Sequence, residues 1–222
     1  MEVKILGISG SMRKDSGTEH AVQEALKAAQ EIDADITTEF ISLNSKKINT
    51  CIHCDRCFKK GTLCALKDDF QEVQKSFLEA DGFILGSPVY NMNVTPVLSA
   101  FMSRVRPTYL VHPGHFTRKV GGAIAVGGGR NGGQEMTILN IHNFYQTYEI
   151  LCCGGSLAEP AGAMLWSRDG SREGAKNDAP GNMGAVRIGK RVAQTAAFLK
   201  FGWECFEKEG KNIYITQKWF DY

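Results

Sequence analysis

The sequence predicts a doubly wound α/β fold built on a five-stranded parallel sheet. Its 222 residues suffice for one large domain, and 43% of them are hydrophobic, which is enough for a sizeable core. Five short apolar or β-branched segments have the character of buried parallel strands. Segments with helical periodicity separate these strands, and such an alternation joins parallel strands through right-handed crossovers.

The first half of the chain accounts for three strands and two helices. The first strand, 2–9, is apolar and β-branched and ends in a glycine–serine turn. A helix at about 18–32 has alanine and leucine near helical spacing. The second strand, 36–42, is rich in isoleucine and threonine, and acidic residues that suit a helix N-terminus lead a helix at about 69–80. The third strand, 82–87, is almost fully apolar, as a central parallel strand should be.

The second half repeats this alternation. A helix around 94–106 follows a proline-containing turn, and the fourth strand lies within the glycine-rich segment 119–129. A helix covers roughly 133–148, the fifth strand is expected at 149–157, and the last helix runs from about 183 into the 200s. Five strands in this rhythm fit the flavodoxin-like arrangement, with spatial order 2-1-3-4-5.

This fold also predicts where a ligand binds. In an open parallel sheet the ligand lies outside the carboxyl ends of the strands, near the point where the strand order reverses. We expect one flavodoxin-like domain over residues 1–209, followed by a C-terminal tail at 210–222. The segments that follow the expected strand ends are 9–18, 43–68, 87–95, 127–134 and 157–182.

The turn after the first strand, SGSMRKDSGT, has the composition of a phosphate site. It combines glycines, hydroxyl groups and a guanidinium immediately before a helix. Backbone N–H groups at a helix N-terminus favour an anion, and Arg13 adds a charge-assisted donor. A plain capped surface turn has a similar composition. The position after the first strand favours a mononucleotide phosphate ester, because the turn is neither a dinucleotide fingerprint nor a Walker A loop.

Two further segments suit a planar heterocycle. Pro88 fixes the direction of the turn PVYN, Tyr90 offers an aromatic edge, and exposed amides there can reach ring oxygens and nitrogens. The glycine-rich segment 127–133 lets the backbone approach the same ring closely. Taken singly, each segment is also explained as a tight proline turn or a flexible glycine loop.

With these motifs together, the chain resembles the NADPH-dependent FMN reductase superfamily. The resemblance spans about residues 2–200 and rests on GSMRKDSGT, ADGFILGSPVYNMNVTPVLSAFMSRV and NDAPGNMGAVRIGKRVA. It implies FMN at the carboxyl edge of the sheet, and a homodimer or homotetramer with flavin at subunit interfaces. The chain departs from the pattern at Ala100 and Ser103, where relatives often have lysine and aspartate. Carried onto this sequence, the resemblance places around the phosphate Ser9, Ser11, Arg13, Ser16 and Thr18, and beside the isoalloxazine ring Pro88, Val89, Tyr90, Asn91, Met92, Gly127, Gly128 and Gly129.

Four of the seven cysteines lie in one short segment, 51–64. Cys51, Cys54, Cys57 and Cys64 are spaced C-x2-C-x2-C-x6-C. Successive x2 spacings present three sulfurs to one small cluster, and the glycine-containing segment that follows brings back the fourth, which favours [4Fe–4S]. Three alternatives stay open: a zinc site with four cysteine ligands, thiols kept for packing or redox chemistry without a cluster, and a disulfide loop.

The cysteine spacing also resembles the iron–sulfur flavoprotein branch of the superfamily. This resemblance implies an oxidoreductase that passes electrons from a donor such as ferredoxin through the cluster to FMN. A small acceptor such as oxygen, peroxide or quinone then receives them. Because the cysteines follow a strand end, cluster and flavin are expected to share one rim of the sheet. No side chain is expected to act as a catalytic acid or base, because the cofactors carry the chemistry.

Two other functions compete with this one. The first is a cluster-free NAD(P)H-dependent FMN reductase that acts on quinones, azo compounds or metal ions. The second is a non-enzymatic electron carrier or redox sensor. In the first case nicotinamide would stack on an exposed flavin face and deliver hydride.

Charge and composition exclude several classes of partner. The formal net charge of +2 gives no electrostatic reason to expect nucleic acid or an anionic membrane. The basic pairs 46–47 and 59–60 are expected to be solvated surface. We see no signal peptide, and no apolar run approaches the roughly 20 residues of a membrane span, so a cytoplasmic protein is expected.

Three remaining features have simpler expected roles. Cys152 and Cys153 should pack in the core, because they lie on the fifth strand. His112 and His115 precede the fourth strand, at the opposite edge of the sheet, and are expected in a turn or an oligomer contact. The segment 158–182 is too long for a passive connection and is expected to cover the flavin or to contact a neighbouring subunit.

Overall fold

The computed structural model describes residues 1–211 and confirms the predicted parallel sheet. Five strands follow the order β2-β1-β3-β4-β5, every pairing is parallel, and a sixth strand pairs with β4. The strands are β1 (Val3–Ser9), β2 (Ile36–Ser42), β3 (Gly82–Pro88), β4 (Val120–Gly127), β5 (Leu151–Cys153) and β6 (Ala163–Trp166). The predicted tail boundary falls at the edge of the described residues, and most of the tail lies outside them.

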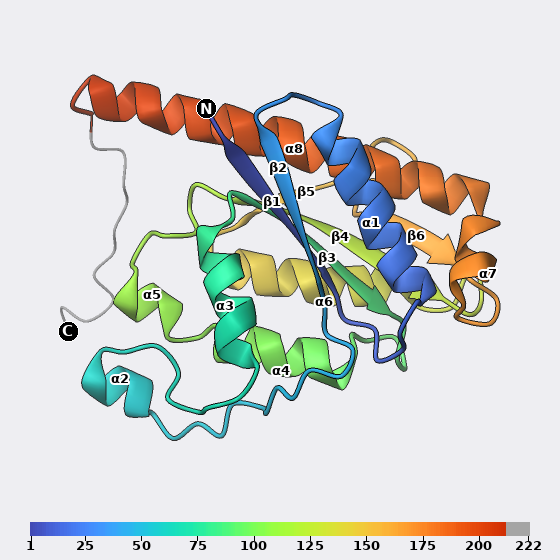
Figure 1. The fold of residues 1–222 in the computed structure, drawn as a ribbon, viewed down its shortest axis with the longest axis horizontal. Coiled ribbons are helices and arrows are strands. Elements are labelled where there is room, and N and C mark those ends of the chain that lie inside the picture. The colour runs from blue at the N-terminus through green and yellow to red at the C-terminus, as the bar shows by residue number, and fades with distance from the viewer. Residues whose placement is uncertain (212–222) are drawn as a thin grey trace.

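Helices cover both faces of the sheet (Figure 1). One apolar layer lies between the sheet and the pair α1 and α8, and the other lies between the sheet and α3, α4 and α6. This is the double layer that the β-α-β alternation predicts, because crossovers of one hand place helices on alternate faces. The helices are α1 (Gly17–Gln30), α2 (Arg56–Lys60), α3 (Phe70–Glu79), α4 (Pro96–Arg104), α5 (Thr108–Val111), α6 (Gln134–Thr147), α7 (Arg172–Lys176) and α8 (Ala179–Lys208).

The central strands are buried on both faces, as their composition predicts. All residues of β4 are buried, and β1 leaves only Lys4 partly exposed. On one side of the sheet the phenylalanines of α3, β3 and α4 pack together, with the Phe77 and Phe83 rings stacked at a centroid distance of 4.1 Å. On the other side small residues let α8 approach α1 closely: a Cβ at Gly189 would lie 1.9 Å from the carbonyl oxygen of Ala25.

The predicted fifth strand is wrong in length. β5 covers three residues and pairs with the start of β4. β6 then pairs with the second half of β4, from Ile124 to Gly127, on the same side of that strand. The chain leaves the sheet at Gly154, where a Cβ would lie 2.1 Å from the carbonyl oxygen of Pro160. The fifth position is therefore built from two short strands, and one of them lies inside the segment expected to be a loop.

Several helix boundaries differ from the prediction for identifiable reasons. The helix after β3 ends at Arg104, and α5 begins after Pro107. The ring of a proline disfavours the helical conformation of the residue before it, so the helix stops ahead of Pro107. The last helix begins at Ala179, four residues before the expected start, with Pro180 in its first turn, where a missing N–H costs nothing. The short helices α2 and α7 lack the length for a periodic signal.

Within residues 1–211, no helix combines the length and the apolar character that crossing a bilayer requires.

Candidate functional site

The turn between β1 and α1 is held in shape by its own hydroxyl groups. Ser16 is the N-cap of α1: its Oγ accepts from the Glu19 N–H at 3.2 Å, and the Glu19 carboxylate accepts from the Ser16 N–H at 3.3 Å. This capping box satisfies two of the first amides of the helix. The Ser11 hydroxyl accepts from the Arg13 N–H at 3.1 Å. The hydroxyl of Thr18, which is 2% exposed, makes no hydrogen bond to a described residue and is available to a ligand.

Arg13 reaches from this turn to the segment after β6. Its Nη1 donates to the carbonyl oxygen of Asp169 at 2.9 Å, and the Gly17 N–H donates to the carbonyl oxygen of Gly170 at 3.2 Å. Residues 167–170 therefore close one side of the phosphate turn. The guanidinium remains exposed enough for its other donors to meet an anion, and Arg13 suits a phosphate because its planar fork offers five donors.

The proline turn after β3 is tied directly to the phosphate turn. Thr95 is the N-cap of α4, and its Oγ1 donates to the carbonyl oxygen of Gly10 at 2.6 Å. Asn91 and Met92 both have positive φ, at 50° and 64°, and the Tyr90 and Asn93 backbones exchange two hydrogen bonds of 2.9 Å. This tight turn presents Tyr90, which is 43% exposed, at the edge of the site.

Gln134 shapes the glycine loop, a role that the sequence analysis missed. Its side chain is 1% exposed, its Nε2 donates to the carbonyl oxygen of Gly129 at 2.6 Å, and its Oε1 accepts from the Gly132 N–H at 2.8 Å. A Cβ at Gly127 would lie 2.4 Å from Gln134 Nε2, so only glycine permits this contact. Trp166 also binds the loop, because its Nε1 donates to the carbonyl oxygen of Gly128 at 2.7 Å.

These three turns meet around one cavity of about 270 Å³ at the carboxyl edge of the sheet. The predicted residues that line it are Ser11, Arg13, Ser16, Thr18, Pro88, Val89, Tyr90 and Gly128. The other predicted residues belong to the same turns without lining the cavity, namely Ser9, Asn91, Met92, Gly127 and Gly129. The sequence analysis did not name five further lining residues. One is Val126 on β4, and the others are Ser167, Arg168, Asp169 and Gly170, which lie in the segment 158–182 that was expected to cover the flavin or to contact a neighbouring subunit. The signal of these four in the sequence is the apolar AMLW followed by SRDGS, which repeats the strand-then-turn pattern of the phosphate site.

The four cysteines of the segment 51–64 line a second, much smaller hollow of about 20 Å³. All are free thiols, so the structure contains no disulfide loop here. Cys54 is exposed and the other three are partly exposed. Within the described residues no group of three or more acidic, histidine or cysteine side chains converges closely enough to hold a metal ion. The four cysteines therefore line the same hollow without converging on one point. To hold a cluster, the loop would have to bring the sulfurs closer together.

The end of α4 anchors this cysteine loop. The Cys51 N–H donates to Ser103 Oγ at 3.3 Å, so the serine that departs from the family pattern has a contact of its own here. Arg106 Nη1 lies 2.8 Å from Asp55 Oδ1, and its guanidinium stacks over the Phe58 ring at 4.1 Å. Burial raises the pKa of the Cys57 thiol, and the charge of Arg106 acts in the opposite direction.

Arg104 supplies the observation that tests whether this hollow fits a cluster. It lines the hollow, its side chain is fully buried, and its Nη1 lies 2.5 Å from Asp68 Oδ2. Its Nε finds no acceptor among the described residues. A buried donor without a partner is costly, and a group bound in this hollow could relieve that cost. Four thiols that line one hollow with a buried, unpaired donor group therefore fit a thiolate-bound group, while the charge of Arg104 is already balanced by Asp68.

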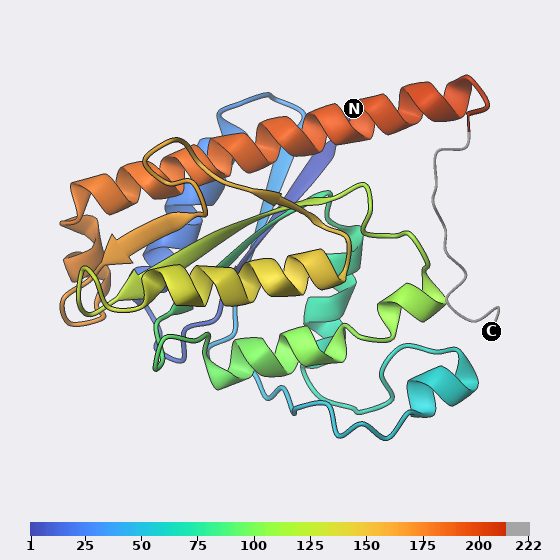
Figure 2. The same cartoon turned by 180° about the vertical axis from the view of Figure 1, so that it is seen from behind.

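The expectation that both sites share one rim of the sheet is wrong within a single chain. After β2 the Leu43 N–H still contacts the Ser9 carbonyl oxygen, but the chain then runs along α4 to its far end, where Cys51 meets Ser103. The nine residues of α4 span about 13 Å, and the two cavities share no residue. Figure 2 shows α2 and the cysteine loop at the end of the molecule away from the phosphate turn. The direction of residues 43–50 carries no local signal that predicts this.

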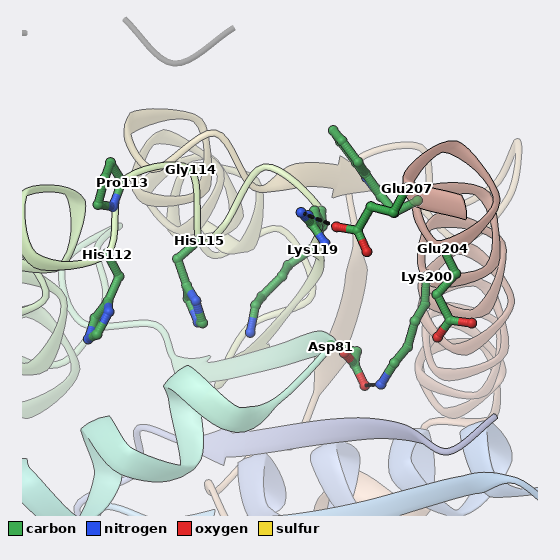
Figure 3. Close-up of a pocket in the computed structure, with 11 residues that line it drawn as sticks. Asp81, His112, Pro113, Gly114, His115, Lys119, Lys200, Glu204 and Glu207 are labelled. Atoms are coloured by element: carbon green, nitrogen blue, oxygen red, sulfur yellow. Dashed lines mark hydrogen bonds and ion pairs between the residues drawn. The ribbon is translucent and has the colours of Figure 1, made fainter. Parts of the chain in front are cut away.

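A third cavity, of about 700 Å³, lies at the amino-terminal edge of the sheet (Figure 3). His115 Nε2 lies 2.8 Å from the carbonyl oxygen of Leu78, and Lys119 Nζ donates to the carbonyl oxygens of Leu78 and Ala80. Both side chains thus cap the C-terminal end of α3, where cations are favoured. Burial lowers the pKa of Lys119 to about 8. His112 and His115 lie in a turn, as expected, and their surroundings indicate a structural role.

The remaining cysteine prediction is confirmed in part. Cys153 is buried in the layer under α8, whereas Cys152 is only partly buried, because β5 lies at an edge of the sheet.

Comparison with known proteins decides the family. The family model for NADPH-dependent FMN reductase matches residues 3–158. The chain belongs to this family. Two iron-sulfur flavoproteins of Methanocaldococcus jannaschii resemble this FMN reductase homologue closely. One is 43% identical over 81% of this chain and 89% of its own length. The other is 42% identical over 89% of this chain and 100% of its own length. Together these matches place the chain in the iron–sulfur flavoprotein branch, and its activity is that of a flavin-dependent oxidoreductase using FMN.

A solved structure supports the fold independently. The WrbA-like flavodoxin from Agrobacterium tumefaciens superposes on this FMN reductase family member with a TM-score of 0.60. The match covers 89% of this chain and 99% of the flavodoxin. The sequences are 14% identical, so this likeness shows the fold alone.

Proposed function

We propose that this protein binds FMN and a [4Fe–4S] cluster and transfers electrons from a donor such as ferredoxin to a small acceptor. Oxygen, peroxide and quinones are the acceptor classes proposed. The observation that carries the proposal is the hollow lined by four free thiols in a chain of the FMN reductase family. Cysteine thiolates in such a compact run suit iron–sulfur ligation, and Arg104, whose buried Nε has no acceptor among the described residues, lines the same hollow.

The cavity at the carboxyl edge is the proposed FMN site. Around the phosphate we assign Ser9, Ser11, Ser16 and Thr18 with the guanidinium of Arg13. Beside the ring we assign the backbone of residues 88–92 and 127–129. The chain contributes anion binding at the start of α1, a bond from Arg13, and close backbone approach at the glycine loop. When bound, FMN supplies storage of one or two electrons and the cluster supplies single-electron transfer.

Cys51, Cys54, Cys57 and Cys64 are the proposed cluster ligands. The chain's own contribution is to hold the loop against α4 through Ser103 and Arg106, and to place two guanidinium groups beside the thiols. Hydrogen bonds and nearby charge of this kind tune both the stability and the reduction potential of such a group.

The separation of the two sites supports a homodimer or homotetramer as the working form. Within one chain the cysteine hollow and the FMN cavity lie beyond opposite ends of α4. A second copy can bring its own FMN cavity to the cysteine loop of the first. We therefore propose that electrons cross between subunits.

Replacement of the cysteines tests the cluster directly. Cys54→Ala should abolish iron and acid-labile sulfide while FMN remains bound at the wild-type level. Cys205→Ala is the matched control, because Cys205 is partly exposed on α8 and lies outside the cysteine segment. If Cys54→Ala retains iron as well as Cys205→Ala does, the ligand assignment is wrong.

A cluster-free NAD(P)H-dependent reductase is the second candidate. Two observations favour it: the thiols do not converge in the described part of the chain, and Arg168, which lines the proposed FMN cavity, stacks over the Trp166 ring at 4.7 Å. Such a cation suits the phosphates of a nicotinamide nucleotide. Rapid anaerobic bleaching of the flavin by NADPH in iron-free protein would establish this function, and no bleaching would exclude it.

A further inference from the structure

The cysteine segment is strongly basic. Between residues 44 and 67 there are six lysines and arginines and a single carboxylate, Asp55. The whole chain has a formal net charge of only +2, so the remainder is net acidic. The one carboxylate is already paired with Arg106 at 2.8 Å. The positive charge is therefore concentrated around the thiols.

Most of these cations are free to meet a partner. Lys46 is paired with Glu72 at 3.0 Å, whereas the other five have exposed side chains and no ion pair with a described residue. Arg56, Lys59 and Lys60 stand on α2 at positions i, i+3 and i+4, which lie on one face of a helix. Figure 1 shows α2 projecting from the body of the molecule. Five unpaired cations in one short segment make this surface a favourable one for an acidic partner.

The thiol hollow is reached from solvent beside this charge. Cys54 is the exposed member of the four cysteines, and its neighbour Ile52 is a large apolar side chain that is 65% exposed. An exposed apolar residue close in sequence to several exposed cations resembles a transient docking patch, with an apolar centre and a polar rim.

We propose that Ile52, Cys54 and the α2 cations Arg56, Lys59 and Lys60 form the docking surface for a small acidic electron-carrier protein. The inference rests on the proposed function and adds the site at which the donor binds. Acidic groups around the carrier's redox centre complement the basic rim and speed its encounter with the surface. A cluster held by the four cysteines would accept one electron from the reduced carrier, with no bond made or broken and no proton moved.

The test is the binding of an acidic ferredoxin to the full chain with Lys59→Glu and Lys60→Glu together. The dissociation constant, measured by titration calorimetry at low ionic strength, should rise by about tenfold or more. High salt should weaken wild-type binding towards the variant's value, because exposed charges are screened. Ile52→Ala should also weaken binding several-fold without changing charge.

The matched control is Lys27→Glu with Lys208→Glu, which changes the net charge equally at exposed sites on α1 and α8. It should leave binding within about twofold of wild type. Equal weakening by both pairs would overturn the docking surface. Reduction by dithionite, which needs no docking, separates the two proposals: if the wild type has no reducible cluster, the proposed function fails, whatever the carrier binds.

Discussion

Arg104 and Asp68 form a buried ion pair that joins the end of α4 to the chain leaving the cysteine loop. Arg104 Nη1 lies 2.5 Å from Asp68 Oδ2, and the two side chains are 0% and 5% exposed. Burial alone would raise the pKa of Asp68, but hydrogen bonds from Arg104 and from the backbones of Asn49 and Phe70 lower it to about 2. The pair therefore fixes both ends of the cysteine segment to one helix.

Asp68→Ala should destabilise the protein by about 3–5 kcal/mol, because it leaves the guanidinium buried and uncompensated. The measurement is urea unfolding at neutral pH. Glu135→Ala, at an exposed carboxylate of α6, should change the free energy of unfolding by less than about 0.5 kcal/mol. Since the folded-state pKa of Asp68 is depressed, its contribution is present above about pH 4 and is lost as the pH falls towards 2. A loss below about 1 kcal/mol in Asp68→Ala would contradict this role.

Arg13→Ala should weaken FMN binding by roughly ten- to a hundredfold, the worth of one charge-assisted hydrogen bond. The change also removes the bond to the Asp169 carbonyl that closes the phosphate turn. Quenching of flavin fluorescence measures the dissociation constant. Lys14→Ala, at the adjacent exposed cation, is the control and should have little effect. Equal affinities of the two variants would show that Arg13 has no special place at the phosphate.

His115 should make the protein less stable in mild acid. Burial, and then the nearby charge of Lys119, lower its pKa from 6.5 to about 4. The unfolded chain binds a proton first as the pH falls, so stability is lost between about pH 6.5 and pH 4. The loss is on the order of 2 kcal/mol once screening by solvent at this partly buried ring is allowed for. His115→Gln should flatten the dependence of the unfolding free energy on pH in this window. An unchanged slope would contradict the assignment.

Transfer between subunits predicts complementation in mixed oligomers. A chain with Cys54→Ala lacks the cluster, and a chain with Arg13→Glu and Thr18→Asp repels the FMN phosphate. Neither alone should pass electrons from ferredoxin to a quinone. Oligomers assembled from both should recover activity, because the cluster of one chain then meets the flavin of the other. Mixed oligomers as inactive as the parents would contradict transfer across subunits.

The strand order and the three turns around the FMN cavity were predictable because they follow from local patterns. Apolar runs such as 82–87 give a strand, and glycine and hydroxyl residues before α1 give the turn and the capped start of that helix. The prediction of the fifth strand was wrong in length, because a three-residue strand followed by a return loop has no periodicity of its own. Contacts between residues far apart in the sequence were also not predicted, and the hydrogen bond from Trp166 Nε1 to the carbonyl oxygen of Gly128 is one example.

The predicted position of the cysteine loop was also wrong, because it depends on contacts between residues far apart in the sequence. The spacing of the four cysteines predicts what they bind, but where they lie depends on the pairs Cys51 with Ser103 and Arg104 with Asp68. No local propensity encodes contacts between residues so far apart in the chain. The family resemblance marked Ser103 as a departure, and only the structure shows the contact that it makes.

Chemical analysis of anaerobically purified protein tests the central proposal most directly. Iron, acid-labile sulfide and flavin are counted against protein concentration in a single preparation. About four irons, four sulfides and one FMN per chain are expected, as a [4Fe–4S] cluster on four thiols requires. Stoichiometric FMN with no acid-labile sulfide would contradict the cluster and leave a flavoenzyme whose cysteines serve another purpose.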